Sequence, residues 1–127
     1  MSWTVDPASD VPPSRQLVEA VLDAVARGEL VAGQKLPSVR RMAAEALVNP
    51  NTVARAYRDL DHMGAVQGQN GRGVFVTERG PKIAREARRG ATLSAFIRAT
   101  REALRAGHTP VELQRIVLEK GEVRKTG

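Results

Sequence analysis

The sequence has no cysteine, few aromatic residues and no long apolar run. Its 127 residues include two histidines, one tryptophan, one tyrosine and two phenylalanines. The absence of thiols excludes disulfides, cysteine nucleophiles and thiolate metal sites. No apolar segment approaches the roughly 20 residues that a membrane-spanning helix needs. The N-terminal segment also lacks the basic and apolar parts of a signal peptide. We therefore expect a cytoplasmic protein that does not contact membranes.

The residue types that are present predict a folded, mostly helical protein rather than an enzyme. Hydrophobic residues make up 42% of the chain and charged residues 27%, which is a globular composition. The length excludes a large catalytic scaffold. Ser14, Ser38 and Ser94 have no neighbouring base in the sequence, and neither Asp59 nor Asp61 has the i, i+4 spacing from His62 that a helical metal pair needs. We predict no catalytic residues and no metal site, and interpret His62 as a surface histidine.

The net charge of +6 is distributed unevenly along the chain. Residues 1–80 are neutral overall, so residues 81–127 hold the whole excess. Within the neutral part, residues 1–34 carry a net charge of −3 and residues 35–58 a net charge of +4. A local basic stretch in a neutral domain indicates a face that binds a polyanion. The alternative is that these cations merely lie on helix faces that are exposed to solvent.

Apolar periodicity predicts three helices in the first half of the chain. The first follows Ser14 and ends at Gly28, the second begins at Ser38, and the third runs from Asn49 to Gly64. The residues predicted to face the core are Leu17, Val18, Val21, Leu22 and Val25, then Val39, Met42, Ala43 and Ala46, then Val53, Ala56, Tyr57, Leu60 and Met63.

A β-hairpin is expected after the third helix. Short apolar segments at 65–67 and 74–76 flank the Asn70-Gly71 pair, which is a strong turn signal. Three helices followed by a glycine-rich, basic hairpin are typical of a winged helix-turn-helix. The expected fold class is therefore mostly α with a small β-hairpin wing.

The remaining residues predict a short two-helix tail. One long helix is expected over 81–106, although Gly90 leaves open whether it is continuous, and another over 110–120 after a capping box at Thr109 and Glu112. Two such helices cannot bury their apolar sides alone, so we expect a second copy of the chain to cover them. The predicted dimer interface comprises Leu93, Phe96, Ile97, Leu104, Leu113, Ile116 and Val117.

Three segments, 28–40, 48–57 and 71–76, resemble the GntR family of bacterial transcription regulators in sequence and spacing. The Asn-Pro-Asn-Thr-Val segment with a short helical tail is similar to the YtrA subfamily, whose members are dimeric repressors often encoded beside ABC transporters. The family's MocR regulators add an aminotransferase-like domain, for which residues 78–127 are too few. We therefore expect no pyridoxal phosphate and no other cofactor. The expected organisation is an extended lead-in over 1–13, a DNA-binding domain over 14–77 and a dimerisation tail over 78–127.

The resemblance also implies which residues contact DNA. An arginine in the family's Leu-Pro-Ser-x-Arg segment reaches DNA in relatives, and that arginine falls on Arg40. Arg41 and Arg58 are expected to contact phosphates. Pro50 and Ala54 stand where some relatives use arginines for base contacts, so the operator sequence cannot be transferred. The predicted DNA-binding set is Ser38, Arg40, Arg41, Asn49, Asn51, Thr52, Arg55, Arg58, Asn70, Gly71 and Arg72.

These expectations combine into one function. The chain is predicted to be a homodimeric repressor that binds a palindromic operator in double-stranded DNA, with a transporter operon as an expected target. It would associate with the nucleoid when bound. The sequence identifies no small-molecule effector. The alternative is a protein-interaction module built on a winged helix that no longer binds DNA.

Overall fold

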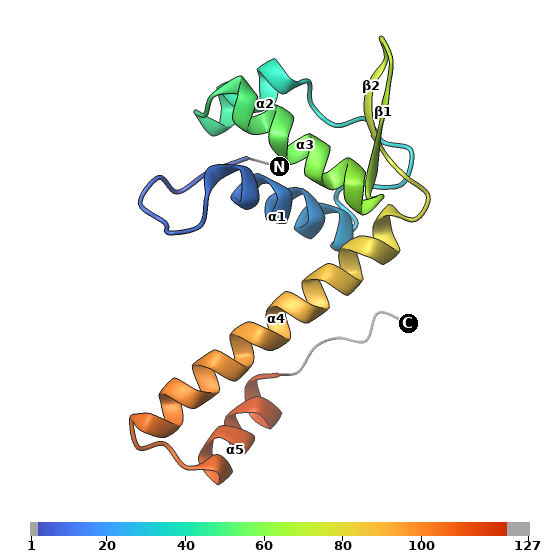
Figure 1. Ribbon diagram of the computed structural model, residues 1–127. Helices are drawn as coiled ribbons and strands as arrows, with labels where there is room; N and C mark the ends of the chain where they lie inside the picture. Colours follow the sequence, from blue (N-terminus) through green and yellow to red (C-terminus); the bar gives the residue numbers. More distant parts are fainter. Residues whose placement is uncertain (1–2, 122–127) are drawn as a thin grey trace. The chain divides into compact units, whose positions relative to one another are not determined.

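The computed structural model describes residues 3–121 and shows two compact units, the first ending at Arg89 and the second beginning at Gly90. The first unit contains three helices, a two-stranded antiparallel sheet and the start of a fourth helix (Figure 1). Its elements are α1 (Pro13–Ala26), α2 (Val39–Ala46), α3 (Pro50–Met63), β1 (Val66–Gln69), β2 (Gly73–Val76) and residues 80–89 of α4 (Gly80–Arg105). This order confirms the winged helix-turn-helix that the sequence predicts.

The core of the first unit is built by one face of each of the three helices. Leu17 and Val21 of α1, Met42 of α2, and Val53 and Leu60 of α3 are all completely buried. Three expected core positions differ. Val18 and Val39 are only partly buried, and Met63 is 39% exposed. Met63 is exposed because it is the last residue of α3, beyond Leu60, the last buried residue of this helix.

The N-terminal lead-in contributes to this core, which the sequence pattern did not indicate. Trp3 is only 4% exposed and belongs to the cluster of buried residues. Gln16 of α1 holds the lead-in in place, because its side chain accepts a hydrogen bond from Asp6 N–H at 2.8 Å and donates to Asp6 O at 3.0 Å and Val11 O at 2.8 Å. The lead-in is therefore packed against α1.

The hairpin gains a third extended segment from the loop between α1 and α2. Lys35 lies opposite Phe75 in an antiparallel bridge. On either side of it, Leu36 N–H donates to Val74 O at 2.8 Å, and Val76 N–H donates to Gln34 O at 2.9 Å. The loop that leads into α2 is thus attached to the free edge of β2.

The second unit comprises the rest of α4 and α5 (Pro110–Lys120). The long helix is continuous through Gly90. Thr109 caps α5 as predicted, accepting from Glu112 N–H at 3.1 Å. The carboxylate of Glu112 lies 2.5 Å from His108 Nδ1. It therefore contacts His108 rather than the backbone N–H of Thr109, as the capping box would require. No helix in the described part of the chain is long and apolar enough to cross a membrane.

The turn between α2 and α3 stores conformational strain at Leu47. This residue has φ 56° and ψ 48°, a left-handed conformation that costs an L-residue roughly 1 kcal/mol, and its side chain is 89% exposed. We expect Leu47→Gly to stabilise the chain by about 0.5–1 kcal/mol, because it relieves the strain and removes no buried surface. Chemical denaturation would measure this change.

Leu47→Ala is the matched control, because it shortens the same exposed side chain but keeps the Cβ atom that causes the strain. Its stability should stay close to that of the wild type. A Leu47→Gly variant that is less stable than Leu47→Ala would show that the left-handed conformation is not a cost at this position.

Candidate nucleic-acid interface

Two side-chain caps position the start of α2 and the start of α3. Ser38 Oγ accepts a hydrogen bond from Arg41 N–H at 3.2 Å, and Asn49 Oδ1 accepts from Asn51 N–H at 2.7 Å. Both predicted N-caps are therefore confirmed. The cap uses one lone pair of the Asn49 oxygen and leaves both amide N–H groups available for another partner.

The outer face of α3 carries one continuous polar stripe. Asn51, Arg55, Arg58 and His62 follow one another at intervals of four, three and four residues, and all four are exposed. This spacing keeps them on one side of an α-helix, opposite the buried side. His62 was not among the predicted interface residues, although its spacing from Arg55 and Arg58 could have included it. Thr52 lies beside the stripe and is partly buried.

The two arginines at the start of α2 differ in their surroundings. Arg41 Nε lies 3.1 Å from Glu45 Oε1, one helical turn away. Arg40 is exposed and forms no ion pair within the described residues. A cation in the first turn is disfavoured by the helix dipole, by about 0.3–1 kcal/mol. Arg40 therefore presents an unpaired charge that an anion outside the chain would stabilise.

Tyr57 connects α3 to the segment that precedes α2. Its side chain is 5% exposed, as predicted for a core residue, and its hydroxyl donates to Pro37 O at 2.7 Å. Burial, and secondarily the charge of Glu45, raise the pKa of Tyr57 well above its ordinary value of 10.0. The phenol thus stays protonated and keeps its hydrogen bond to Pro37 O. This bond fixes the start of α2 relative to α3.

The hairpin ends in a three-residue turn formed by Asn70, Gly71 and Arg72. Gly71 has φ 72°, and Arg72 N–H donates to Gln69 O at 3.0 Å. All three turn residues are exposed. Within β1, one residue before its turn end, Gly68 N–H donates to Asp61 Oδ2 of α3 at 3.0 Å. This bond satisfies a donor on the free edge of β1 and attaches the hairpin to α3.

A groove of about 310 Å³ separates α3 from the hairpin. Arg58 and His62 of the polar stripe border it, so the structure places the second half of this stripe beside the wing. Its full lining is Val39, Ala54, Tyr57, Arg58, Asp61, His62, Gly68 and Val74. No group of three or more histidine, aspartate or glutamate side chains in residues 3–121 is placed to hold a metal ion.

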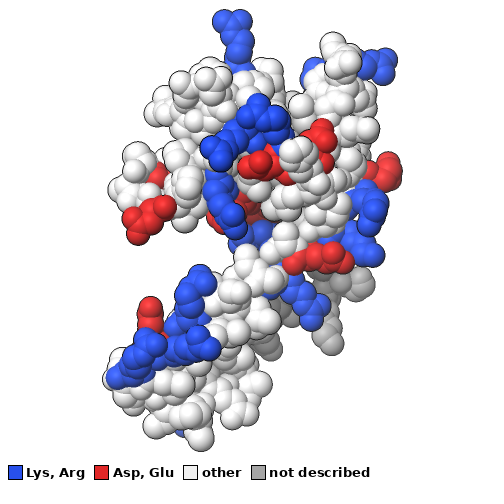
Figure 2. All heavy atoms as spheres, in the orientation of Figure 1, with Lys and Arg blue, Asp and Glu red and all other residues white. Residues whose placement is uncertain are grey.

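The face shown in Figure 2 carries no single basic patch on the winged part, because acidic side chains are interspersed with basic ones there. The tail shows few acidic side chains in the same view. In the first unit, Arg40, Arg55, Arg58 and Arg72 form no ion pair with any other described residue. The unpaired cations of the first unit that could meet an anion therefore include those at the start of α2, on α3 and at the hairpin turn.

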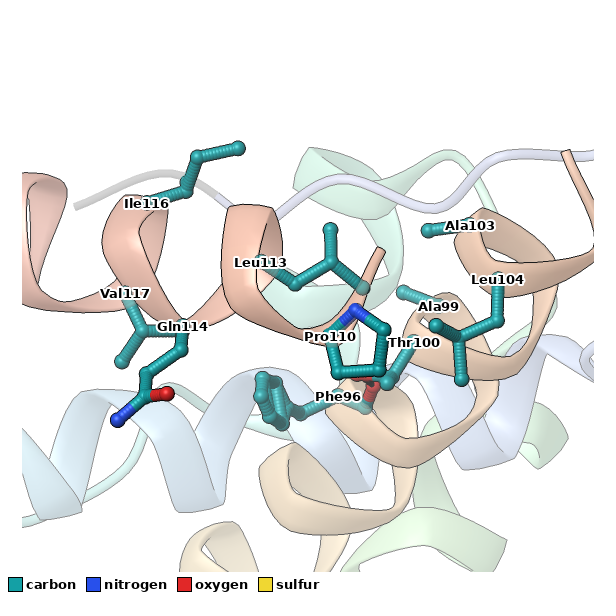
Figure 3. A pocket seen from close by; sticks show the side chains of 10 residues that line it. All are labelled: Phe96, Ala99, Thr100, Ala103, Leu104, Pro110, Leu113, Gln114, Ile116 and Val117. Carbon is teal, nitrogen blue, oxygen red and sulfur yellow. Dashed lines mark hydrogen bonds between the residues drawn. The ribbon is translucent and has the colours of Figure 1, made fainter. Parts of the chain in front are cut away.

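The predicted dimer residues lie in the second unit, where an apolar groove of about 420 Å³ separates α4 from α5 (Figure 3). Leu93 and Ile97 lie outside the lining of this groove, whereas the other predicted residues line it: Phe96, Leu104, Leu113, Ile116 and Val117. Leu93, Phe96 and Ile97 are 58%, 49% and 42% exposed, and no residue among 90–121 is buried. The groove is lined by Phe96, Ala99, Thr100, Ala103, Leu104, Pro110, Leu113, Gln114, Ile116 and Val117. The tail therefore exposes the apolar side chains that the sequence predicts for an interface.

Known proteins share both the sequence and the fold. Residues 13–76 match the profile of the family described as "Bacterial regulatory proteins, gntR family". The HTH-type transcriptional repressor YtrA of Bacillus subtilis is 36% identical over 74 residues, covering 58% of this chain and 57% of that protein. The chain thus aligns with less than two thirds of this relative's length.

Two solved structures extend the similarity into the tail. YtrA from Sulfolobus acidocaldarius, a GntR-family transcription factor, has a TM-score of 0.60 and 30% identity, covering 76% of this chain and 99% of that chain. A transcriptional regulator from Oenococcus oeni has a TM-score of 0.73 and 28% identity, covering 91% of this chain and 95% of that chain. The similarity therefore includes more than the winged domain.

The burial of Tyr57 predicts how the protein responds to alkali. Its folded-state pKa is raised above the unfolded value, so the stability it contributes is present below pH 10 and is lost as the pH rises further. Since Tyr57 is the only tyrosine, tyrosinate absorbance reports on it alone. We expect this absorbance to rise only together with unfolding measured by circular dichroism. Titration near pH 10 in the folded protein would contradict the burial.

Proposed function

Because this chain belongs to the GntR family of bacterial regulatory proteins, we propose that it acts as a homodimeric repressor at a two-fold symmetric operator. Family membership makes it a DNA-binding transcriptional regulator and not an enzyme. The observation that carries the finer proposal is the exposed stripe of α3, whose arginines have no partner within the described residues and lie beside a basic wing. We propose the functional division into a lead-in 1–13, a DNA-binding domain 14–77 and a tail 78–127.

The N-terminal half of α3 has the chemistry of base recognition. Arg55 can pair with both acceptors of guanine, Asn51 can pair with adenine, and Thr52 can contact a phosphate or the thymine methyl group. These contacts require the helix to lie in the major groove, with its first turns against the bases. Arg40 adds an unpaired guanidinium from the start of α2, and we assign it to a base or a phosphate.

The other residues of the predicted set position the protein on the duplex. Arg58 borders the groove between α3 and the hairpin, which suits contact with the phosphate strand between the major and minor grooves. Arg41 pairs with Glu45, and the oxygens of Ser38 and Asn49 cap their helices. We therefore assign Arg41, Ser38 and Asn49 to the phosphate backbone.

The wing is assigned to the minor groove. Gly71 adopts positive φ without strain, and its lack of a side chain lets the backbone of the turn approach DNA closely. Asn70 and Arg72 flank it and are exposed. The minor groove distinguishes mainly A·T from G·C pairs, so this contact adds affinity and only coarse selectivity.

A second copy of the chain is the proposed occupant of the tail groove. The second unit has no buried residue in its described part, so it has no core of its own. Its exposed apolar side chains lie on both helices, as a self-complementary contact requires. Two joined winged domains would match two half-sites of a palindrome.

The regulatory direction and the target follow from similarity rather than from geometry. The Bacillus relative is named a transcriptional repressor, and the resemblance to the YtrA subfamily implies genes for an ABC transporter as neighbours. We propose repression of such an operon. A gel shift with the DNA upstream of the chain's own gene would test it, and failure to bind that DNA or any selected duplex would favour the protein-interaction alternative.

Arg55 should determine one base pair in each half-site. We expect Arg55→Ala to reduce operator affinity by about 1–3 kcal/mol and to relax discrimination at that position, because a bidentate base contact is lost. Competition binding against a set of single-base operator variants would measure both effects. An equal loss on every variant would make Arg55 a phosphate contact.

Arg72→Ala is the matched comparison, because it removes the same side chain from the wing. Its loss of affinity should be similar for all variants, with any residual preference limited to A·T-rich against G·C-rich flanks. If Arg72→Ala instead changed the preference at a position within the half-site, the assignment of the wing to the minor groove would be wrong.

The tail proposal predicts a change in oligomeric state from one substitution. Phe96→Glu places a charge on the apolar groove and should weaken the dimer by at least about tenfold, since each such side chain contributes about 1.5–3 kcal/mol when buried. Ser94→Glu introduces the same charge at an exposed residue that does not line the groove. Sedimentation should find this control dimeric. Equal dimerisation of both variants would place the interface elsewhere.

A further inference from the structure

Among the lysines that the structure describes, Lys35 is the one whose side chain lies on the hairpin. Its backbone lies opposite Phe75, and the two hydrogen bonds beside it attach this segment to β2. The two residues are 40 positions apart, and Lys35 is not among the interface residues that the sequence predicts. The fold therefore adds a cation to the wing from a loop that precedes α2.

The register of the hairpin shows on which face this cation lies. Residues opposite each other in an antiparallel pair share a face, and neighbours along a strand alternate. Lys35 therefore shares a face with Phe75 and Gly73, whereas Val74 and Val76 belong to the other face. Val76 is buried, and Val74 borders the groove beside α3. Lys35 thus lies on the outer face of the wing, away from α3.

The side chain of Lys35 extends across Gly73 toward the hairpin turn. A Cβ atom built on Gly73 would lie 2.6 Å from Lys35 Cε and 3.4 Å from Nζ. Gly73 also has φ 122°, which only glycine adopts readily. Because Gly73 has no side chain, the Lys35 side chain can pass over it. Gly73 directly follows Arg72, the last residue of the hairpin turn, so the lysine ends close to that turn. The exposed ammonium of Lys35, which forms no ion pair with another described residue, is therefore held near the turn.

We propose that Lys35 contacts a phosphate of the DNA strand along the outer side of the wing. This inference rests on the proposed function, in which the turn enters the minor groove. That groove is about 6 Å wide and is bounded by a phosphate strand on each side. On the inner side, Arg58 and His62 of α3 border the wing. Lys35 supplies the corresponding cation on the outer side, so the wing meets both strands with a basic group.

The test uses the full chain, a duplex selected by it from random sequence, and a scrambled duplex of equal length. Lys35→Met removes the charge but keeps an alkyl side chain over Gly73, so the hairpin is preserved. Because a phosphate contact is independent of sequence, affinity for both duplexes should fall by the same factor. The slope of log K against log salt should become shallower by about 0.9 for each Lys35 removed.

Two further variants separate the charge from its position. Lys35→Arg keeps the cation and should keep the wild-type slope. Arg27→Met removes one positive charge that is already paired with Asp23 at 3.2 Å and Glu29 at 3.4 Å, and it should leave affinity and slope unchanged.

The outcomes distinguish this inference from the proposed function. If the wild type binds the selected duplex and Lys35→Met retains its affinity and slope, Lys35 does not contact phosphate. A loss confined to the selected duplex would make Lys35 a base contact and would also overturn the proposal. If selection from random sequence yields no duplex that the wild type binds, the proposed function itself is wrong.

Discussion

The complete burial of one face of α3 is the constraint on which the proposed DNA-binding surface depends. Val53, Ala56 and Leu60 have no exposed surface, so the helix cannot rotate about its axis without exposing them. Burial of a side chain such as that of Val53 or Leu60 stabilises the fold by roughly 1.5–3 kcal/mol. The direction of Asn51, Arg55 and Arg58 follows from this packing, because they lie on the opposite side of the same helix. The polar side chains are thus oriented by the apolar residues on the buried side of the helix.

The wing is oriented by hydrogen bonds on both edges of the hairpin. On one edge, Asp61 accepts from Gly68 N–H, and on the other, the segment around Lys35 pairs with β2. A two-stranded hairpin alone is marginally stable in water. With both edges attached to the helical core, the turn at Gly71 keeps a defined position relative to α3. The hydrogen bond from the Tyr57 hydroxyl to Pro37 O likewise fixes the start of α2 relative to α3.

The two units differ in how they bury their apolar side chains. The first buries its apolar side chains within one chain and presents cations without partners on α2, on α3 and at the turn. The second presents apolar side chains around a groove and has no buried residue in its described part. We propose that the second unit completes its core with another copy of the chain. A two-fold operator would then be recognised through an apolar contact that is distant in sequence from the residues that contact bases.

Local features of the chain were predictable because they depend on neighbouring residues. Ser38, Asn49 and Thr109 cap helices through bonds to residues two or three positions away, and these caps are confirmed. The helices, the hairpin and the family similarly follow from short-range patterns. The sequence did not settle whether the long helix continues through Gly90, since a single glycine costs only about 1 kcal/mol and packing can exceed this.

The elements, their order, most of the buried stripe of α3 and the residue types on its outer face could thus be predicted from the sequence, because each depends on residues within one or two helical turns. Three contacts became apparent only in the folded chain: Trp3 enters the core, Asp61 holds the hairpin and Lys35 lies across Gly73. These three contacts join segments whose pairing has no local periodic signal. They exist because buried apolar groups need neighbours and strand edges need hydrogen-bond partners, whichever part of the chain supplies them.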